Sequence, residues 1–377
     1  MATTRYFCKN LYNGENWQQN RLIIVAQDII QDVIDGTPEQ ADKVLSSYTT
    51  PGFIDTQVNG GGGELFNHTP TADTLMRMLR AHAKFGTTQM LPTLITDNYA
   101  CMQAAADAMA SMQDMHLKGF IGIHFEGPHL SLPKRGIHPA KQIRPISNKE
   151  MSLFCRKDIG QVLLTLAPET VPLEQIHALQ EAGVIISLGH SNATYTQALS
   201  AIDAGATGFT HLFNAMSMSK ARDPGVVGTA LDTENTFAGI IVDTHHVHQA
   251  NCQIAIKCKT PDRLMLVTDA MNHADAPEAE LIFNGEQIVL ENGKLTTPDG
   301  TLAGSALDMI TAVKNTHQWL NVPLEIALQM ASTSPAAFLG LSKKLGKVKA
   351  GFQADFVSFD DNYKVNTAIC AGKSLLS

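Results

Sequence analysis

Eight short apolar runs, separated by amphipathic stretches, constrain the fold of this chain more than any other feature of its sequence. Each run is bounded by glycine, proline or asparagine and is typical of a buried strand. The runs are 51–58, 87–95, 119–126, 162–167, 184–189, 207–212, 237–243 and 263–269. The stretches between them with apolar residues at helical spacing include 71–85, 98–115, 172–183 and 193–205.

This alternation of strand and helix implies parallel strand pairing, and eight repeats indicate closure into a (β/α)8 TIM-like barrel of the α/β class. An open, doubly wound sheet is the structural alternative. Such a sheet gathers its ligands at one switch point. Here polar residues follow nearly every run, which favours the barrel.

The two ends of the chain have a different character. Residues 1–49 and 346–377 contain short β-type runs with turn signals, and neither piece is expected to build a core alone. We predict that they pair as a small β-sandwich domain beside a barrel at 50–345. Residues 279–302 carry two Asn-Gly dipeptides and predict a β-hairpin insertion between the last barrel strand and its helix.

Composition excludes several classes of partner. The net charge of −8 argues against a nucleic-acid surface, which would need a basic stripe. No apolar run approaches the roughly 20 residues of a membrane helix. The six cysteines form no C-x-x-C pair and no signal peptide is evident, so we expect free thiols and a cytoplasmic protein.

Four side chains suited to metal or proton chemistry follow four different runs. Glu126, His190 and His211 each come at or just past the end of one, and Asp269 ends the last. Any one of them could be an ordinary hydrogen-bonded strand end. Together they fall on the carboxyl-terminal mouth of a barrel, where barrel enzymes carry out their chemistry. A carboxylate and two imidazoles suit one divalent cation and leave a position for water. A nearby carboxylate could take that water's proton. The sequence predicts a metal-dependent hydrolase.

Longer motifs extend this prediction over nearly the whole chain. They are PGFIDTQVNGGGG (51–63), HFEGPHL (124–130), LGHSNAT (188–194), THLFNAM (210–216) and VTDA (267–270). In this order they resemble the amidohydrolase superfamily, and within it the family of N-acetylglucosamine-6-phosphate deacetylases. The resemblance implies hydrolysis of the N-acetyl group to glucosamine 6-phosphate and acetate. It makes Glu126, His190 and His211 the metal ligands and Asp269 the general base and acid.

The end of the first barrel strand departs from the common superfamily pattern. Many amidohydrolases hold a second metal there with His-x-His, whereas this chain has Asp55-Thr56-Gln57. Glutamine is a poor ligand, so the chain resembles the single-metal branch. We expect one divalent ion per subunit, which we take to be zinc; iron, manganese and cobalt suit the same ligands.

The resemblance also implies the substrate contacts. His138 would approach the acetyl carbonyl and donate to the developing oxyanion. Arg222 would reach the sugar phosphate from a neighbouring subunit, which implies a homodimer. The full set of implied substrate-binding residues is Gln57, His138, Asn214, Ala215, Arg222, His246 and Leu302.

Two other functions remain open at this stage. The first is another amidohydrolase that acts on a cyclic amide or an N-acyl amino acid. Such enzymes often have a lysine after the fourth strand, where this chain reads VLLTLAPE. The second is a non-catalytic sensor of a sugar phosphate. A sensor is expected to have lost a ligand or the acid/base residue, and all four are present.

Overall fold

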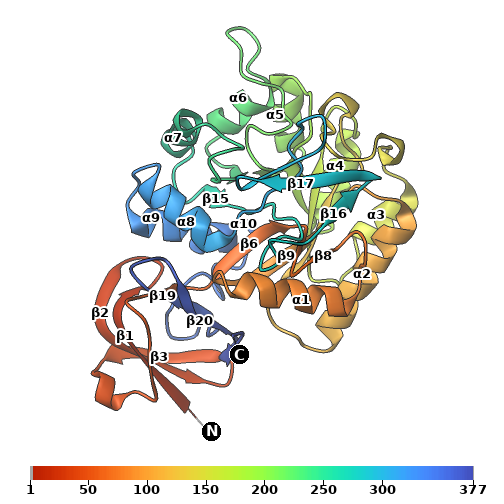
Figure 1. Cartoon of the computed structure of the whole chain (residues 1–377). Coiled ribbons are helices and arrows are strands. Elements are labelled where there is room, and N and C mark those ends of the chain that lie inside the picture. The colour runs from red at the N-terminus through yellow and green to blue at the C-terminus, as the bar shows by residue number, and fades with distance from the viewer. Residues whose placement is uncertain (1–2, 377) are drawn as a thin grey trace.

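The computed structural model describes residues 3–376 and shows an α/β barrel beside a small β sheet (Figure 1). The prediction of eight parallel barrel strands is confirmed, in the order β15-β14-β13-β12-β11-β10-β9-β6. The ring closes through a parallel bridge between Val58 and Ala270. The strands are β6 (Phe53–Val58), β9 (Thr87–Ile95), β10 (Gly122–Glu126), β11 (Gln161–Leu166), β12 (Ile185–Leu188), β13 (Gly208–Phe209), β14 (Phe237–Ile240) and β15 (Leu264–Leu266).

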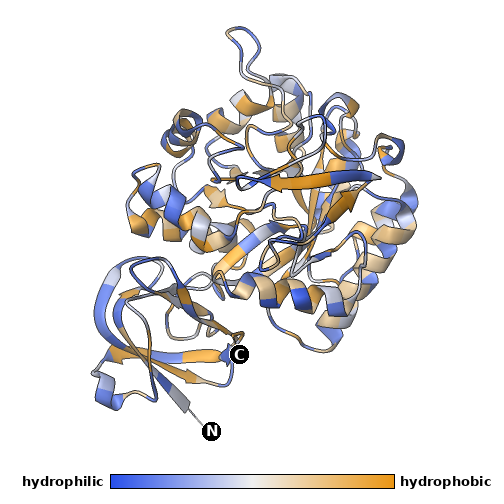
Figure 2. Cartoon of the chain, viewed as in Figure 1, coloured by the Kyte–Doolittle hydropathy of each residue, from blue (hydrophilic) through white to orange (hydrophobic). Residues whose placement is uncertain are grey.

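Helices surround these strands, and several start at the caps that their sequences favour. Thr71, Asn98 and Thr194 each accept a hydrogen bond from a backbone N–H in the first turn. Along the helices, hydrophobic and hydrophilic residues are mixed, as one buried face requires (Figure 2). The helices are α1 (Ala72–Ala83), α2 (Tyr99–Asp114), α3 (Asn148–Phe154), α4 (Leu173–Glu181), α5 (Tyr195–Asp203), α6 (Gly225–Asp232), α7 (Gln249–Cys258), α8 (Met309–Gln318), α9 (Leu324–Ala331) and α10 (Thr333–Phe338). Within residues 3–376, no helix combines the length and apolar character that a membrane span requires.

Both ends of the chain contribute to the small sheet, as predicted. Its order is β21-β20-β19-β5-β1-β2-β3, with β4 beside β1. The sheet encloses its own apolar cluster, in which the rings of Tyr6 and Phe356 lie 5.0 Å apart. The bridge between Ile29 and Gln353 ties the edge strand back to the C-terminal segment, so the sheet curls as a sandwich does. How the chain divides into independently folding units stays a prediction. The strands are β1 (Thr3–Tyr12), β2 (Trp17–Ala26), β3 (Ile29–Asp35), β4 (Lys43–Val44), β5 (Tyr48–Pro51), β19 (Phe356–Phe359), β20 (Val365–Cys370) and β21 (Lys373–Ser374).

The insertion after β15 forms an antiparallel meander of β16 (Leu281–Phe283), β17 (Glu286–Glu291) and β18 (Lys294–Thr296). Both Asn-Gly turns have positive φ at their two central residues, as type I′ hairpins require. The meander packs on Leu65 and Ile95 at one side of the barrel. At the other side, a Cβ on Gly293 would lie 3.5 Å from His245. The meander therefore crosses the barrel mouth, where Figure 1 shows β17.

Candidate active site

A cavity of about 530 Å³ opens at the carboxyl-terminal mouth of the barrel. It gathers side chains that are far apart in the sequence, because parallel strands end on the same side. The predicted residues that line it are Glu126, His138, His190, His211, Asn214, Ala215, His246, Asp269 and Leu302. The structure thus places most of the predicted site in one cavity, while the role of each residue stays a prediction.

Three of the four residues predicted to bind the metal or transfer protons have strained backbones. The φ angles of His190, His211 and Asp269 are +47°, +34° and +52°, in the left-handed region that non-glycine residues rarely adopt. Such a conformation costs about 1–3 kcal/mol and persists only where the surroundings enforce it. All three residues follow the ends of barrel strands. The sharp turn there directs each side chain over the mouth instead of along the strand.

The acceptor atoms of Glu126, His190 and His211 converge on one point. Glu126 Oε1 lies 3.4 Å from His190 Nε2 and 3.1 Å from His211 Nε2, and the two Nε2 atoms are 3.0 Å apart. Ligand bonds of about 2.0–2.2 Å arranged tetrahedrally separate the ligand atoms by about 3.4 Å, so these spacings suit a shared cation. His138 Nε2 lies 3.9 Å from Glu126 Oε2 and belongs to an overlapping candidate group with Glu126 and His190.

The protonation of these groups also fits a cation. His190 Nδ1 faces the carbonyl of Lys134 at 2.8 Å, and a carbonyl only accepts, so this nitrogen carries the proton. In the neutral ring, Nε2 therefore presents a lone pair to the cluster. Burial opposes ionisation of Glu126, but the adjacent imidazoles of His190 and His211 outweigh it and hold its pKa well below 4.5. Two imidazole nitrogens and a carboxylate oxygen this close together can all act as ligands of one cation.

Asp269 lies next to this cluster and has a raised proton affinity. Its Oδ1 accepts hydrogen bonds from Asn59 Nδ2 at 2.7 Å and from Gln57 Nε2 at 3.2 Å. Burial, followed by the negative charge of Glu126, raises the pKa of Asp269 to about 6. A carboxyl with a pKa near 6 can both accept and return a proton near neutral pH.

Thr96 controls which nitrogen of His138 carries a proton. Its hydroxyl donates to the backbone oxygen of Glu126 at 3.1 Å and lies 2.8 Å from His138 Nδ1. With its proton used in this way, the hydroxyl accepts from Nδ1, which leaves Nε2 as a lone pair in the neutral ring. Burial, and then the charge of His190, lower the pKa of His138 well below 6.5. His138 can therefore donate from Nε2 only if the Thr96 hydroxyl turns towards Nδ1.

Two predicted substrate residues lie outside the cavity. Gln57 is buried beneath it, where its amide bridges Glu126 Oε1 at 3.0 Å and Asp269. Its position makes it a brace between two site carboxylates. Arg222 is exposed on the loop between β13 and α6, away from the cavity of its own chain.

Several residues of the site were not predicted from the sequence. Lys134 and Lys294 line the cavity, and the latter comes from the meander. Asp243 accepts from His246 Nδ1 at 2.5 Å. A signal existed for Asp243, because it ends an apolar run just as Asp269 does. Asn59 and Thr96 each come directly after an apolar run and carried the same signal, whereas no comparable signal marked the two lysines.

Comparison with known proteins places the whole chain among related sequences. Residues 48–375 match the amidohydrolase family. An N-acetylgalactosamine-6-phosphate deacetylase of Shewanella sp. (strain ANA-3) is 50% identical, over 88% of this chain and 84% of that protein. An N-acetylglucosamine-6-phosphate deacetylase of Haemophilus influenzae is 37% identical over 93% of each. The crystal structure of N-acetylglucosamine-6-phosphate deacetylase from Pasteurella multocida superposes with a TM-score of 0.95 at 36% identity, over 99% of both chains.

Proposed function

The chain belongs to the amidohydrolase family, and we propose that it hydrolyses the N-acetyl group of an N-acetylated hexosamine 6-phosphate. The products are acetate and the amino-sugar phosphate. The observation that carries this proposal is the juxtaposition of Asp269 with the Glu126, His190 and His211 cluster. An amide needs both a nucleophilic water and a proton for its departing nitrogen, and this arrangement supplies a group for each requirement.

Glu126, His190 and His211 would hold one divalent cation. When bound, such an ion polarises the amide carbonyl and lowers the pKa of a coordinated water towards ~7. Zinc is the proposed ion, because a carboxylate with two imidazoles suits it, although iron(II), manganese and cobalt accept the same ligands. Gln57 and Asn59 hold Asp269 beside this point, and their amide hydrogens leave Oδ2 free to take part in proton transfer.

The residues of the chain then share the proton steps. Asp269 accepts a proton from the attacking water, and afterwards gives it to the nitrogen of the leaving amino sugar. His138 stabilises the developing oxyanion by donating from Nε2. This requires the other neutral tautomer of the ring: the Nδ1 proton passes to solvent water, a proton from water is bound at Nε2, and the Thr96 hydroxyl rotates to donate to Nδ1. The rotation gives up one hydrogen bond to the Glu126 carbonyl, and no net charge moves. Because the pKa of His138 is low, a neutral ring does this work instead of an imidazolium.

The phosphate group needs positive partners, and the cavity offers two in the same chain. Lys134 and Lys294 line it, with Asn214 and Ala215 nearby to supply amide donors. We propose that Arg222 of a second copy adds to them in a homodimer. Complementation tests this point. Arg222→Ala and Asp269→Asn variants, each inactive alone, should regain activity when mixed, since one site of the heterodimer is then intact.

The configuration at C4 of the sugar is open between two candidates. The N-acetylglucosamine 6-phosphate prediction agrees with the names of most relatives. The relative with 50% identity is named for the galacto epimer, which makes N-acetylgalactosamine 6-phosphate the second candidate. Both substrates present the same acetamide to the metal cluster and the same phosphate to the lysines. The discrimination must therefore arise at the C4 hydroxyl.

The first experiment measures acetate release from both 6-phosphates by the metal-loaded protein. Unphosphorylated N-acetylglucosamine and the Asp269→Asn variant are the controls. Release that requires the phosphate and Asp269 supports the proposal, and the ratio of kcat/KM values assigns the epimer. Absence of release with zinc, iron(II), manganese and cobalt would refute it. Turnover of other amides would then indicate a different amidohydrolase, and binding without turnover would indicate a sensor.

A further inference from the structure

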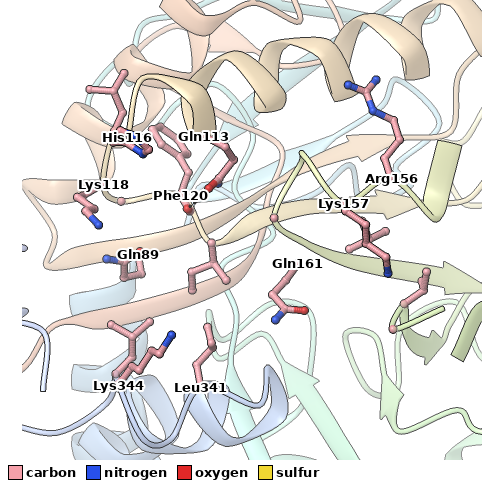
Figure 3. Close-up of a pocket in the computed structure, with 18 of the residues that line it drawn as sticks. Gln89, Gln113, His116, Lys118, Phe120, Arg156, Lys157, Gln161, Leu341 and Lys344 are labelled. Atoms are coloured by element: carbon pink, nitrogen blue, oxygen red, sulfur yellow. Dashed lines mark hydrogen bonds between the residues drawn. The ribbon is translucent and has the colours of Figure 1, made fainter. Parts of the chain in front are cut away.

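A second cavity, of about 500 Å³, lies at the opposite, amino-terminal mouth of the barrel. Its walls are the segments that lead into β10, β11 and β12, together with the chain between α10 and the small sheet. Figure 3 shows Lys118 and Lys344 on one side of this cavity, Lys157 on the other and Gln161 between them. None of these residues takes part in the site at the other mouth.

The lining of this cavity is strongly basic. Four cationic side chains and one imidazole line it, and no aspartate or glutamate does among the described residues. The cations are Lys118, Arg156, Lys157 and Lys344, and the imidazole belongs to His116. A concentration of positive charge is unexpected in a chain whose net charge is −8.

Carboxylates outside the lining neutralise only part of this charge. Arg156 is paired with Asp107 at 2.5 Å and with Asp158 at 2.8 Å, so its charge is satisfied. Lys118 lies 4.0 Å from Asp28, at the limit of an ion pair between two exposed groups. In residues 3–376, neither Lys157 nor Lys344 has a carboxylate within ion-pair distance.

One buried acid lies behind the cavity wall. Gln89 and Gln353 line the cavity and donate their amide hydrogens to Asp355, at 2.7 Å and 3.0 Å. Burial raises the pKa of Asp355, although its hydrogen bonds and Lys118 oppose the rise. The amides of Gln89 and Gln353 therefore lie between Asp355 and the cavity. Because the pKa of Asp355 is raised, its carboxyl carries less negative charge to neutralise the lysines.

Helix ends explain one of the lysines but leave the others unexplained. Carboxyl-terminal helix ends gather at this mouth and attract cations. Lys157 donates to the carbonyl of Ala182 at the end of α4, which is such a cap. Neither Lys118 nor Lys344 donates a side-chain hydrogen bond to a helix-end carbonyl in the described part of the chain. Their ammonium groups face a cavity large enough for a small metabolite.

We propose that this cavity at the amino-terminal mouth, the lower-mouth cavity, binds a small phosphorylated anion through Lys118, Lys157 and Lys344. A phosphate group takes several ammonium donors at once, whereas a single carboxylate would leave part of this charge unmet. Gln161 has no side-chain hydrogen bond within the described residues and supplies a neutral donor at the centre. The ligand is either free phosphate or a metabolite of monosaccharide size that carries one. Binding at this site does not depend on the reaction proposed for the carboxyl-terminal, or upper, mouth of the barrel.

Titration calorimetry tests this site with inorganic phosphate and, separately, with glucose 6-phosphate, on the metal-loaded protein at constant ionic strength. The test variant is Lys118→Gln/Lys344→Gln. Its matched control is Lys149→Gln/Lys343→Gln, which removes the same charge from exposed positions outside the cavity. We expect at least about tenfold weaker binding in the test variant, because two charge-assisted hydrogen bonds to the anion are lost, and unchanged binding in the control.

The pattern across the variants decides the outcome. A loss confined to the test variant, with unchanged kcat/KM for the substrate of the upper mouth, supports the site. The tighter of the two probes then distinguishes free phosphate from a phosphorylated metabolite. Equal affinity in all three proteins overturns the proposal. So does an equal loss in both variants, because that would reflect net charge alone.

Discussion

Asp243 offers the sharpest test of how the active-site cavity is built. Its Oδ2 lies 2.5 Å from His246 Nδ1, and its Oδ1 accepts from the backbone N–H groups of His245 and His246 at 2.8 Å each. A carboxylate only accepts, so Nδ1 carries the proton and Nε2 is the free nitrogen of a ring that lines the cavity. Asp243→Asn keeps the shape of the side chain and removes the charge that fixes this arrangement.

The size of the effect follows from the bond that is lost. Burial opposes ionisation of Asp243, but the hydrogen bond from His246 prevails and lowers its pKa, so the pair is charge-assisted. Such bonds contribute about 1.5–3 kcal/mol, which corresponds to about 10- to 150-fold in an equilibrium constant. His246 is predicted to contact the bound sugar phosphate before and during reaction. The loss should therefore raise KM and change kcat little.

The assay is steady-state acetate release by four proteins: wild type, Asp243→Asn, His246→Gln and the double variant. We expect KM to rise about 10- to 150-fold in Asp243→Asn. If Asp243 acts only by orienting His246, the double variant should be no worse than His246→Gln alone. Metal content should be equal in all four, because Asp243 touches none of Glu126, His190 and His211. Asp262→Asn, at an exposed site, serves as the matched control.

Two results would refute this reasoning. An unchanged KM in Asp243→Asn would mean that the ring holds its position without the carboxylate. Fully additive losses in the double variant would mean that Asp243 acts on something other than His246. A fall in kcat at constant KM would point instead to a role in the chemical step.

Three further changes test other parts of the site. Asp269→Asn should lower kcat by about 10²–10⁴-fold with metal content unchanged, and a residual kcat near that of wild type would remove Asp269 from the proton steps. Glu126→Gln should reduce bound metal to background by elemental analysis, and full retention would mean that the histidines suffice. Burial raises the pKa of Asp55 to about 7. Because the folded state then holds its proton more tightly than the unfolded state, the contribution to stability is present below pH ~4 and is lost as pH rises to ~7, by up to about 4 kcal/mol. Urea unfolding should show this decline in wild type and a flatter profile in Asp55→Asn, and parallel profiles would exclude Asp55 as the cause.

The strand pattern could be predicted because the barrel strands are buried on both faces. β9 spans 87–95 as predicted, and every one of its residues is buried. Boundaries were less accurate where side chains turn over the mouth. The predicted strand 207–212 contains only two strand residues, Gly208 and Phe209, because the chain leaves the strand to place His211 with a positive φ.

Residues that support the site could not be predicted because their role depends on closure of the barrel. Asn59 follows the first barrel strand and Asp269 follows the last, and only the bridge between Val58 and Ala270 brings them to 2.7 Å. A motif indicates which residue is polar at a strand end. It does not indicate that Gln57 lies under the cavity while Asn59 reaches into it. The lower-mouth lysines could not be predicted for the same reason. Lys118 and Lys344 are far apart in the sequence and line one cavity only in the folded barrel.

The strained residues link the stability of the barrel to its chemistry. At about 1–3 kcal/mol each, the left-handed conformations of His190, His211 and Asp269 oppose folding by an amount comparable to a large share of the net stability of a domain. Hydrogen bonds hold them at specific atoms: Lys134 O fixes His190, and Asn59 with Gln57 fixes Asp269. The buried strands beneath offset the cost. The convergence of Glu126 with the two histidines is thus maintained against local backbone preference, and it loosens whenever a supporting contact is removed. Substitutions at Asn59 or Gln57 should therefore impair the site even though neither residue needs to touch the reacting amide.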